Sequence, residues 1–216
     1  MRFAIPMGAL ALALAVPAVV AQQAPSAVQL PGSKDKSRVT AGTYVTDPGH
    51  TLVTWEVDHF GFSEYSGIFG NISGTLTIDP ANLAAAKVDV SIPVAEVTTA
   101  SAGLTQHLLR AGKDGAKPDF FGAAPAPARF VSTSVVLDDD GDEAKITGNL
   151  TLNGVTRPIT LEAKFYGAGL DPMSKKETIG FSAETEFRRS EFGINYGIPM
   201  VSDKVELEIN AAFQKQ

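Results

Sequence analysis

Hydrophobic and polar residues alternate along most of this chain after its first fifty residues. Val53, Trp55 and Val57 fall on every second position of one segment, and Ile159 and Leu161 do the same in a later one. Because side chains of a β-strand point alternately to its two faces, this period predicts strands with one buried face. Many such strands predict an all-β fold whose antiparallel sheet closes into a barrel or packs as a sandwich. A hollow barrel would be a container for an apolar ligand.

Eight segments carry the strand pattern, and turn residues separate them. The strongest hairpin signal is Asn153-Gly154, because both central residues of a type I′ turn need positive φ. Several glycines fall inside predicted strands, where we expect barrel curvature or a ligand close to the backbone: Gly67, Gly70, Gly74, Gly148 and Gly180. The predicted strands are residues 51–59, 65–78, 86–94, 128–137, 143–152, 155–166, 177–189 and 203–214.

One segment departs from the strand period. Leu104 and Leu108 lie four positions apart, which predicts one helix of about three turns over residues 101–111. Gly112 is expected in the left-handed conformation that often follows the end of a helix. Residues 112–128 are rich in Gly, Pro and Ala and predict an ordered loop or a flexible lid.

The N-terminal residues have the layout of a secretory signal peptide. Arg2 gives a positive start, Ala9–Val20 an apolar stretch, and Val19-Val20-Ala21 a small-residue cleavage site. The apolar stretch is shorter than the roughly 20 residues that cross a bilayer, so we expect no membrane-spanning segment. The predicted organisation is a signal peptide over 1–21, a flexible tether over 22–43 and one barrel domain over 44–216, located in the periplasm.

Composition excludes several classes of function. The chain has no cysteine, so a disulfide scaffold, thiol catalysis and thiolate zinc sites are all ruled out. Its formal net charge of −6 comes without a compensating basic run, which argues against nucleic acid as a partner. The same charge gives little attraction to anionic lipid head groups.

Histidines and a run of acidic residues are candidate metal or catalytic groups. His50, His59 and His107 could bind zinc or act as acid and base, but their spacing matches no metal motif. We favour a hydrogen-bonded structural role for His59 and a contact with a ligand head group for His107. The spacing within Asp138–Glu143 invites calcium, yet the twelve-residue calcium loop is absent, so a solvated hairpin tip is favoured.

Arg189 follows Phe187 by two positions and should point toward the barrel interior or its rim. A buried guanidinium needs partners, and the carboxylate of Asp58 or Glu56 could supply one. The alternative is that a pyrophosphate or quinone oxygen of a ligand docks on Arg189. We favour the structural pair.

Several short motifs follow one another in a distinctive order. They are D-P-G-H and T-W-E-V-D-H-F-G-F within 47–62, His107-Leu108, Asp119-Phe120-Phe121, T-G-N-L-T-L-N-G-V-T at 147–156, and R-S-E-F-G at 189–193. No single motif is specific, but together they resemble the YceI-like family over about residues 43–214. The chain departs from the family pattern by a short insertion at 112–117 and by Ala126, where an aromatic residue often precedes the proline. Both departures fall in the stretch expected to cover the barrel mouth.

The resemblance implies an exported, eight-stranded antiparallel barrel of lipocalin-like form that holds an isoprenoid tail in its lumen. It implies a non-enzymatic carrier or reservoir, with no cofactor other than a bound polyisoprenoid or quinone-like lipid. The expected ligand-binding residues are Val53, Trp55, Val57, Phe69, Ile72, Leu76, Val90, Ile92, Leu108, Phe130, Leu150, Leu161, Phe165, Phe181, Phe187, Arg189 and Leu207.

Two other functions remain open from the sequence. One is an exported enzyme on an apolar substrate, with His59 or His107 as base, although no nucleophile elbow or phosphate loop is present. The other is a filled barrel that binds a protein through the loop of residues 112–128. A homodimer also remains open from the sequence, because a strand edge or a barrel face rich in Val and Thr can pair with a second copy of the chain.

Overall fold

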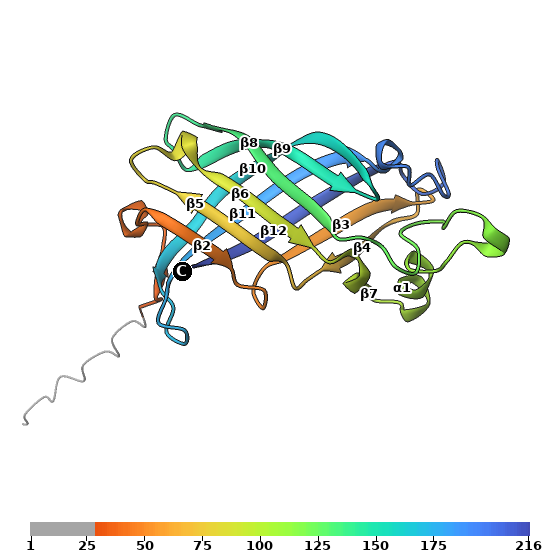
Figure 1. The fold of residues 1–216 in the computed structure, drawn as a ribbon, viewed down its shortest axis with the longest axis horizontal. Helices are drawn as coiled ribbons and strands as arrows, with labels where there is room; N and C mark the ends of the chain where they lie inside the picture. The colour runs from red at the N-terminus through yellow and green to blue at the C-terminus, as the bar shows by residue number, and fades with distance from the viewer. Residues whose placement is uncertain (1–28) are drawn as a thin grey trace, which may run out of the picture.

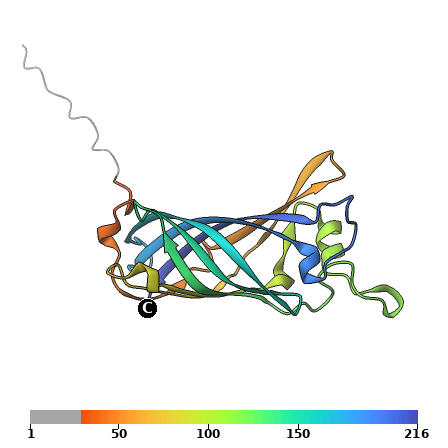
Figure 2. The same ribbon diagram turned by 90° about the horizontal axis from the view of Figure 1, so that it is seen from above.

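The computed structural model describes residues 29–216 and shows an antiparallel β-barrel with eight strand positions, two of which are each occupied by two successive strands (Figures 1 and 2). The described residues contain one α-helix, α1, over Ala102–Leu108. Short 3₁₀ turns are η1 (Lys36–Arg38), η2 (Leu83–Ala85), η3 (Val94–Glu96), η4 (Lys113–Gly115) and η5 (Arg189–Phe192). The strands are β1 (Gly32–Ser33), β2 (Gly42–Thr46), β3 (Leu52–His59), β4 (Ser63–Phe69), β5 (Ser73–Ile78), β6 (Lys87–Ile92), β7 (Thr98–Thr99), β8 (Ala128–Leu137), β9 (Glu143–Leu152), β10 (Val155–Leu170), β11 (Glu177–Arg188) and β12 (Lys204–Lys215).

The barrel closes because β11 pairs with both β10 and β12. Two of the eight strand positions are each occupied by two successive strands. The strands β2 and β3 both pair with β12, and β5 and β4 pair with their other edges. The ring then continues through β6, β8, β9 and β10, with every pairing antiparallel. The eight-stranded antiparallel barrel that the sequence predicts is therefore confirmed.

Most strand boundaries follow the alternation closely. The strand β2 was not predicted, and β10 ends at Leu170 instead of at the predicted residue 166. The bounds of β8 and β9 are those predicted, whereas the single strand predicted over 65–78 is wrong. It is broken between β4 and β5 by Asn71, whose positive φ of 51° ends the extended backbone. A local backbone reversal of this kind leaves no mark on the hydrophobic period.

The β9–β10 hairpin has the predicted type I′ turn. Asn153 and Gly154 both have positive φ, at 52° and 75°. The Asn153 side-chain amide also donates a 3.0 Å hydrogen bond to the carbonyl oxygen of Phe192. The turn therefore ties η5 to this end of the barrel.

The predicted flexible tether is wrong for its second half. Ser33 pairs with Ala168, and the side chain of Val39 packs against the buried core. Lys36 forms a 2.6 Å ion pair with Asp142 in the β8–β9 turn. These contacts hold residues 32–43 against the barrel because a few apolar and charged side chains find partners there. The signal peptide predicted over 1–21 lies outside the described residues.

Helix α1 lies within the predicted range and is shorter than predicted. Ser101 caps it by accepting a hydrogen bond from the backbone N–H of Leu104. The left-handed conformation predicted for Gly112 is wrong, because its φ is −61°. The position still demands glycine, since a Cβ there would lie 1.7 Å from the carbonyl oxygen of Ala116. The loop that follows is irregular apart from η4, as predicted.

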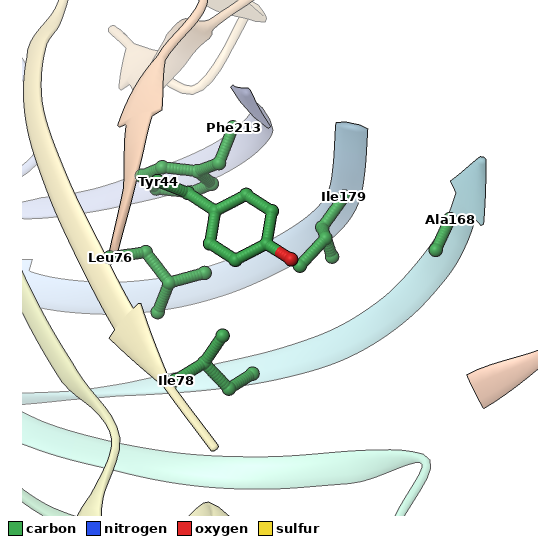
Figure 3. Packing of buried hydrophobic residues seen from close by; sticks show 6 residues of the cluster. All are labelled: Tyr44, Leu76, Ile78, Ala168, Ile179 and Phe213. Atoms are coloured by element: carbon green, nitrogen blue, oxygen red, sulfur yellow. The ribbon is translucent and has the colours of Figure 1, made fainter. Parts of the chain in front are cut away.

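A buried cluster lies at the end of the barrel near the C-terminus (Figure 3). Its largest member, Tyr44, is fully buried and donates a 2.8 Å hydrogen bond from its hydroxyl to the carbonyl oxygen of Thr40. The other members come from four different strands: Leu76, Ile78, Ala168, Ile179 and Phe213. The cluster packs the wall at this end of the barrel, and the space that the side chains leave free in the interior decides whether the barrel is hollow.

Two strand glycines make room for aromatic rings of the barrel wall. A Cβ on Gly67 would lie 2.3 Å from the Trp55 ring, and a Cβ on Gly148 would lie 2.4 Å from the Phe130 ring. The predicted alternatives for these two positions were curvature or a ligand close to the backbone. The structure shows a third cause, which is that each glycine is covered by a ring of the protein itself.

Gly148→Ala is expected to destabilise the barrel by about 1–3 kcal/mol, because the new methyl group overlaps both Phe130 and the carbonyl oxygen of Val131. Urea unfolding followed by circular dichroism measures the change. Gly70→Ala is the matched control, since nothing lies within 4 Å of the position where its Cβ would be. Equal stabilities for the two variants would contradict this account of Gly148.

Candidate functional site

The barrel encloses a cavity of about 990 Å³. All seventeen residues predicted as ligand-binding line it, and for those in strands this agrees with the inward face that the alternation indicates. Contact with a ligand itself stays a prediction for each of them. The cavity runs past the cluster of Figure 3 to the opposite end of the barrel, since its lining includes both Ile78 and Tyr196.

The wall is apolar because each strand turns its hydrophobic positions inward. A second buried cluster centres on Val94, Phe130 and Phe192, and a tier of partly buried side chains packs against it and faces the lumen. Among them are Phe69, Val90, Ile92, Ile146, Ile159, Leu161 and Phe187. The chemistry offered to a ligand is therefore aliphatic and aromatic surface, which recognises shape and length rather than charge.

Trp55 and Tyr65 face each other across β3 and β4, with ring centroids 6.5 Å apart. Both rings line the cavity. Within residues 29–216, neither Trp55 Nε1 nor the Tyr65 hydroxyl has a hydrogen-bond partner, although both atoms are buried. Such orphaned polar atoms are rare, and here they sit in the wall of the lumen.

The end of the cavity near α1 is rimmed by aromatic rings, and we call it the aromatic end. His107, Phe120 and Tyr196 pack edge to face, with centroids 5.3–5.4 Å apart. Phe121 packs against Phe69 of β4 at 6.0 Å, and its backbone N–H donates to the carbonyl oxygen of Leu108. The loop after α1 is in this way folded onto the barrel rim.

Asp119 fixes that loop to α1. Its Oδ2 accepts hydrogen bonds from His107 Nε2 at 2.7 Å and from Arg110 Nη2 at 2.6 Å. The bond from His107, followed by that from Arg110, lowers the pKa of Asp119 below its ordinary value. His107 is thus engaged by the protein, with aromatic rings on its flanks.

The opposite end, which we call the polar end, is covered by different chemistry. Lys36 bridges from η1 to the β8–β9 turn, donating to the carbonyl oxygen of Asp140 at 2.7 Å and pairing with Asp142. Val39 and Leu83 pack on the buried Tyr44 cluster just inside. The acidic run predicted as a solvated hairpin tip is this turn.

Arg189 lies in the rim at the aromatic end and is only 4% exposed. The carboxylate partners predicted for it, Asp58 or Glu56, are wrong. Its guanidinium instead donates four hydrogen bonds of 2.8–3.0 Å, all to backbone carbonyl oxygens: those of Ile194, Tyr196, Val201 and Ser202. Burial lowers the pKa of Arg189, and the nearby charge of Asp203 opposes that shift. A carbonyl cage of this kind satisfies a buried guanidinium as a carboxylate would.

Sequence reasoning missed several lining residues at the aromatic end. Phe120 and Phe121 were visible as a conspicuous pair in the loop, whereas Tyr196 lies in an irregular segment with no period to mark it. Phe60 lines the cavity although it lies beyond the end of β3. Loop residues reach the lumen through tertiary packing that alternation does not report.

The remaining histidines do not assemble a metal site. His50 Nδ1 lies 2.7 Å from Asp47 Oδ2, and this hydrogen bond raises the pKa of His50. His59 is exposed and its ring packs edge-on against Phe60. The hydrogen bond predicted for its side chain is not found within residues 29–216. Over residues 29–216, no group of three or more His, Asp or Glu is placed to hold a metal ion. No helix in that range has the length and hydrophobicity needed to span a membrane.

Residues 44–213 match the family model of the YceI-like domain. The chain belongs to the YceI-like family. It is 43% identical over 162 residues to Protein YceI of Escherichia coli O157:H7, covering 74% of this chain and 80% of that protein. Protein YceI of Salmonella arizonae is 42% identical over the same length. The YceI-like resemblance noted in the sequence is confirmed.

Solved structures of the family share the barrel. The Campylobacter jejuni YCEI protein superposes with a TM-score of 0.60 at 30% identity, covering 74% of this chain and 90% of that one. Burkholderia cenocepacia BcnA gives 0.64 at 22% identity, over 77% and 98% of the two chains. A polyisoprenoid binding domain from Saccharophagus degradans gives 0.53 at 13% identity, over 80% and 98%. The last two likenesses establish the fold alone.

Proposed function

We propose that this protein is exported to the periplasm and holds the tail of an isoprenoid lipid inside its barrel, without catalysing a reaction. The observation that carries the proposal is the apolar cavity, whose volume of about 990 Å³ lies at the upper end of the range of about 300–1,000 Å³ for small-molecule sites. The name of the structural neighbour from Saccharophagus degradans, a polyisoprenoid binding domain, supports the ligand class. The signal-peptide layout of residues 1–21 supports export.

The cavity is long as well as large. A strand of 12 residues, such as β11 or β12, spans about 40 Å, and a tilt of about 40° leaves roughly 30 Å along the barrel axis. Each buried CH₂ contributes about 0.8 kcal/mol, so each five-carbon unit contributes roughly 3–4 kcal/mol before ordering costs. A few units therefore suffice for useful affinity, and an extended branched chain fits this lumen better than a compact molecule.

Two rival functions are less well supported. A filled barrel that only binds proteins conflicts with the cavity. An enzyme would use His59 or His107 as base, and both rings pack against aromatic side chains of the protein: His59 against Phe60, and His107 between Phe120 and Tyr196 with Asp119 on its Nε2. A homodimer stays a prediction.

Protein purified from the periplasm is expected to carry isoprenoid at about one molecule per chain. Extraction with organic solvent followed by mass spectrometry measures it. The protein has one tryptophan, Trp55, in the cavity wall, so adding a polyprenol to stripped protein should also shift its emission. Lack of isoprenoid in the extract together with an unchanged Trp55 emission would refute the proposal, and chemical conversion of the added lipid would favour the enzyme.

A further inference from the structure

The aromatic end presents apolar side chains to solvent as well as to the lumen. Phe60 and Phe62 lie at the tip of the β3–β4 hairpin, which reaches past the barrel wall on the same side as α1 (Figure 2). Phe62 is 89% exposed. Tyr196 and Met200, in the segment between η5 and β12, are also exposed. These four residues form what we call the rim patch.

Backbone contacts join the two segments of the rim patch into one surface. The N–H of Phe60 donates to the carbonyl oxygen of Met200 at 2.7 Å, and His59 forms a bridge with Val201. Phe60, Tyr196 and Met200 also line the cavity. The exposed apolar surface is therefore continuous with the wall of the lumen.

The conformation of Phe60 carries an energetic cost. Its φ is 62° and that of Gly61 is 67°, so it occupies the position of a hairpin turn that usually holds Asn, Asp or Gly. Asn153 takes the corresponding position in the β9–β10 turn. Left-handed backbone is disfavoured for a bulky residue, and strain of this kind gathers at functional positions. A phenyl ring at this tip needs a reason other than the turn.

Charge does not single out this end. The segments that supply the aromatic end nearly balance in charge, because residues 56–64, 107–120 and 188–204 together hold six Lys and Arg against seven Asp and Glu. Isolated aromatic and Met side chains at loop tips, on a nearly neutral background, suit insertion into the interfacial layer of a bilayer better than a flat protein interface.

We propose that the rim patch inserts into the surface of a lipid bilayer, so that the mouth of the lumen opens directly onto the membrane. Apolar insertion, not attraction to anionic head groups, supplies the affinity. The proposal rests on the proposed function, because a membrane is where an isoprenoid lipid enters and leaves solution. It explains why exposed phenyl rings stand at the hairpin tip, where the structure of the barrel does not require them.

Flotation with vesicles of phosphatidylcholine and phosphatidylethanolamine, free of isoprenoid, tests the proposal on the purified exported protein. The double variant Phe60→Asn/Phe62→Ser is expected to bind vesicles with a partition coefficient at least about tenfold lower. Each phenyl ring removed from the interface costs up to about 1.5–3 kcal/mol, which corresponds to about one to two factors of ten in partitioning. Asn suits the backbone at position 60, so the unfolding midpoint should not fall. Met173→Ser is the matched control, because Met173 is equally exposed at 89%, lies in the β10–β11 turn at the polar end and does not line the cavity.

The expected pattern is loss of vesicle binding in the double variant, full binding in Met173→Ser, and no loss in about 1 M salt, where the Debye length is only about 3 Å. Equal binding by the parent and the double variant, or binding only to anionic vesicles at low salt, would overturn the proposal. Solvent extracts of the same proteins keep the two proposals apart. Extracts without isoprenoid from a parent that binds vesicles through its rim patch would sink the carrier function and leave membrane docking standing.

Discussion

Ala183→Trp is expected to empty the barrel while leaving it folded. Ala183 lies midway along β11, opposite Ala163 of β10 and Ile209 of β12, and all three side chains line the cavity. An indole at this position projects into open space rather than into a packed core, so the cost in stability should stay within about 1–3 kcal/mol. The ring obstructs the lumen at its middle. Losing about two buried five-carbon units, at roughly 3–4 kcal/mol each, weakens binding by several factors of ten, so isoprenoid recovered per chain by solvent extraction and mass spectrometry should fall at least tenfold.

Glu184→Trp is the control for this prediction. Glu184 is the next residue of the same strand, is exposed and pairs with Glu162 and Glu208 on the outer surface. A tryptophan there adds the same side chain to the opposite face of the sheet, so the isoprenoid content should match that of the parent. A full ligand load in Ala183→Trp would show that the ligand does not lie in the middle of the lumen.

Arg189→Met is expected to destabilise the protein by about 3–5 kcal/mol. The substitution keeps much of the side-chain volume but leaves four carbonyl oxygens without their donor, one of them buried and three partly buried. Those carbonyls all belong to residues 194–202, so the segment that carries Tyr196 and Met200 should loosen first. Urea unfolding measures the global loss, and hydrogen exchange of residues 194–202 locates it.

Arg188→Met separates this effect from the loss of one positive charge. Arg188 is the neighbouring residue, and its exposed guanidinium makes only a 3.6 Å ion pair with Asp203. Surface pairs of this kind contribute about 0–1 kcal/mol. Intact stability combined with lost ligand in Arg189→Met would reverse the assignment and make Arg189 a head-group site, the alternative considered from the sequence.

The walls of the barrel could be predicted from the sequence because their information is local. Alternation at Ile146, Leu150, Ile159 and Leu161 records which face of each strand is buried, and Asn153-Gly154 records where the chain reverses. The predicted ligand-binding residues that lie in strands all line the cavity for this reason. Strand ends were also close, since polar turn residues interrupt the hydrophobic period.

The ends of the barrel could not be predicted in the same way. The partners of Arg189 are backbone carbonyls, which every residue carries, so no residue type in the sequence identifies them. Lys36 pairs with Asp142, which is more than a hundred residues away in the chain. A polar segment that is held only by such an ion pair and by one packed valine has the composition of a flexible tether, and the sequence therefore predicted one. Tyr196 joins His107 and Phe120 only once three loops have folded together.

If the barrel holds an isoprenoid as proposed, the different chemistry of its two ends gives the bound lipid a direction. A tail that entered between the rings near α1 would advance with its terminal hydrocarbon unit in front, toward the Tyr44 cluster and the Lys36–Asp142 ion pair at the polar end. The oxygen-bearing group at the other end of the molecule then trails at the entrance. A lipid stored this way keeps its reactive group within reach of whatever enzyme or membrane receives it, and it can be withdrawn by that group without being turned around.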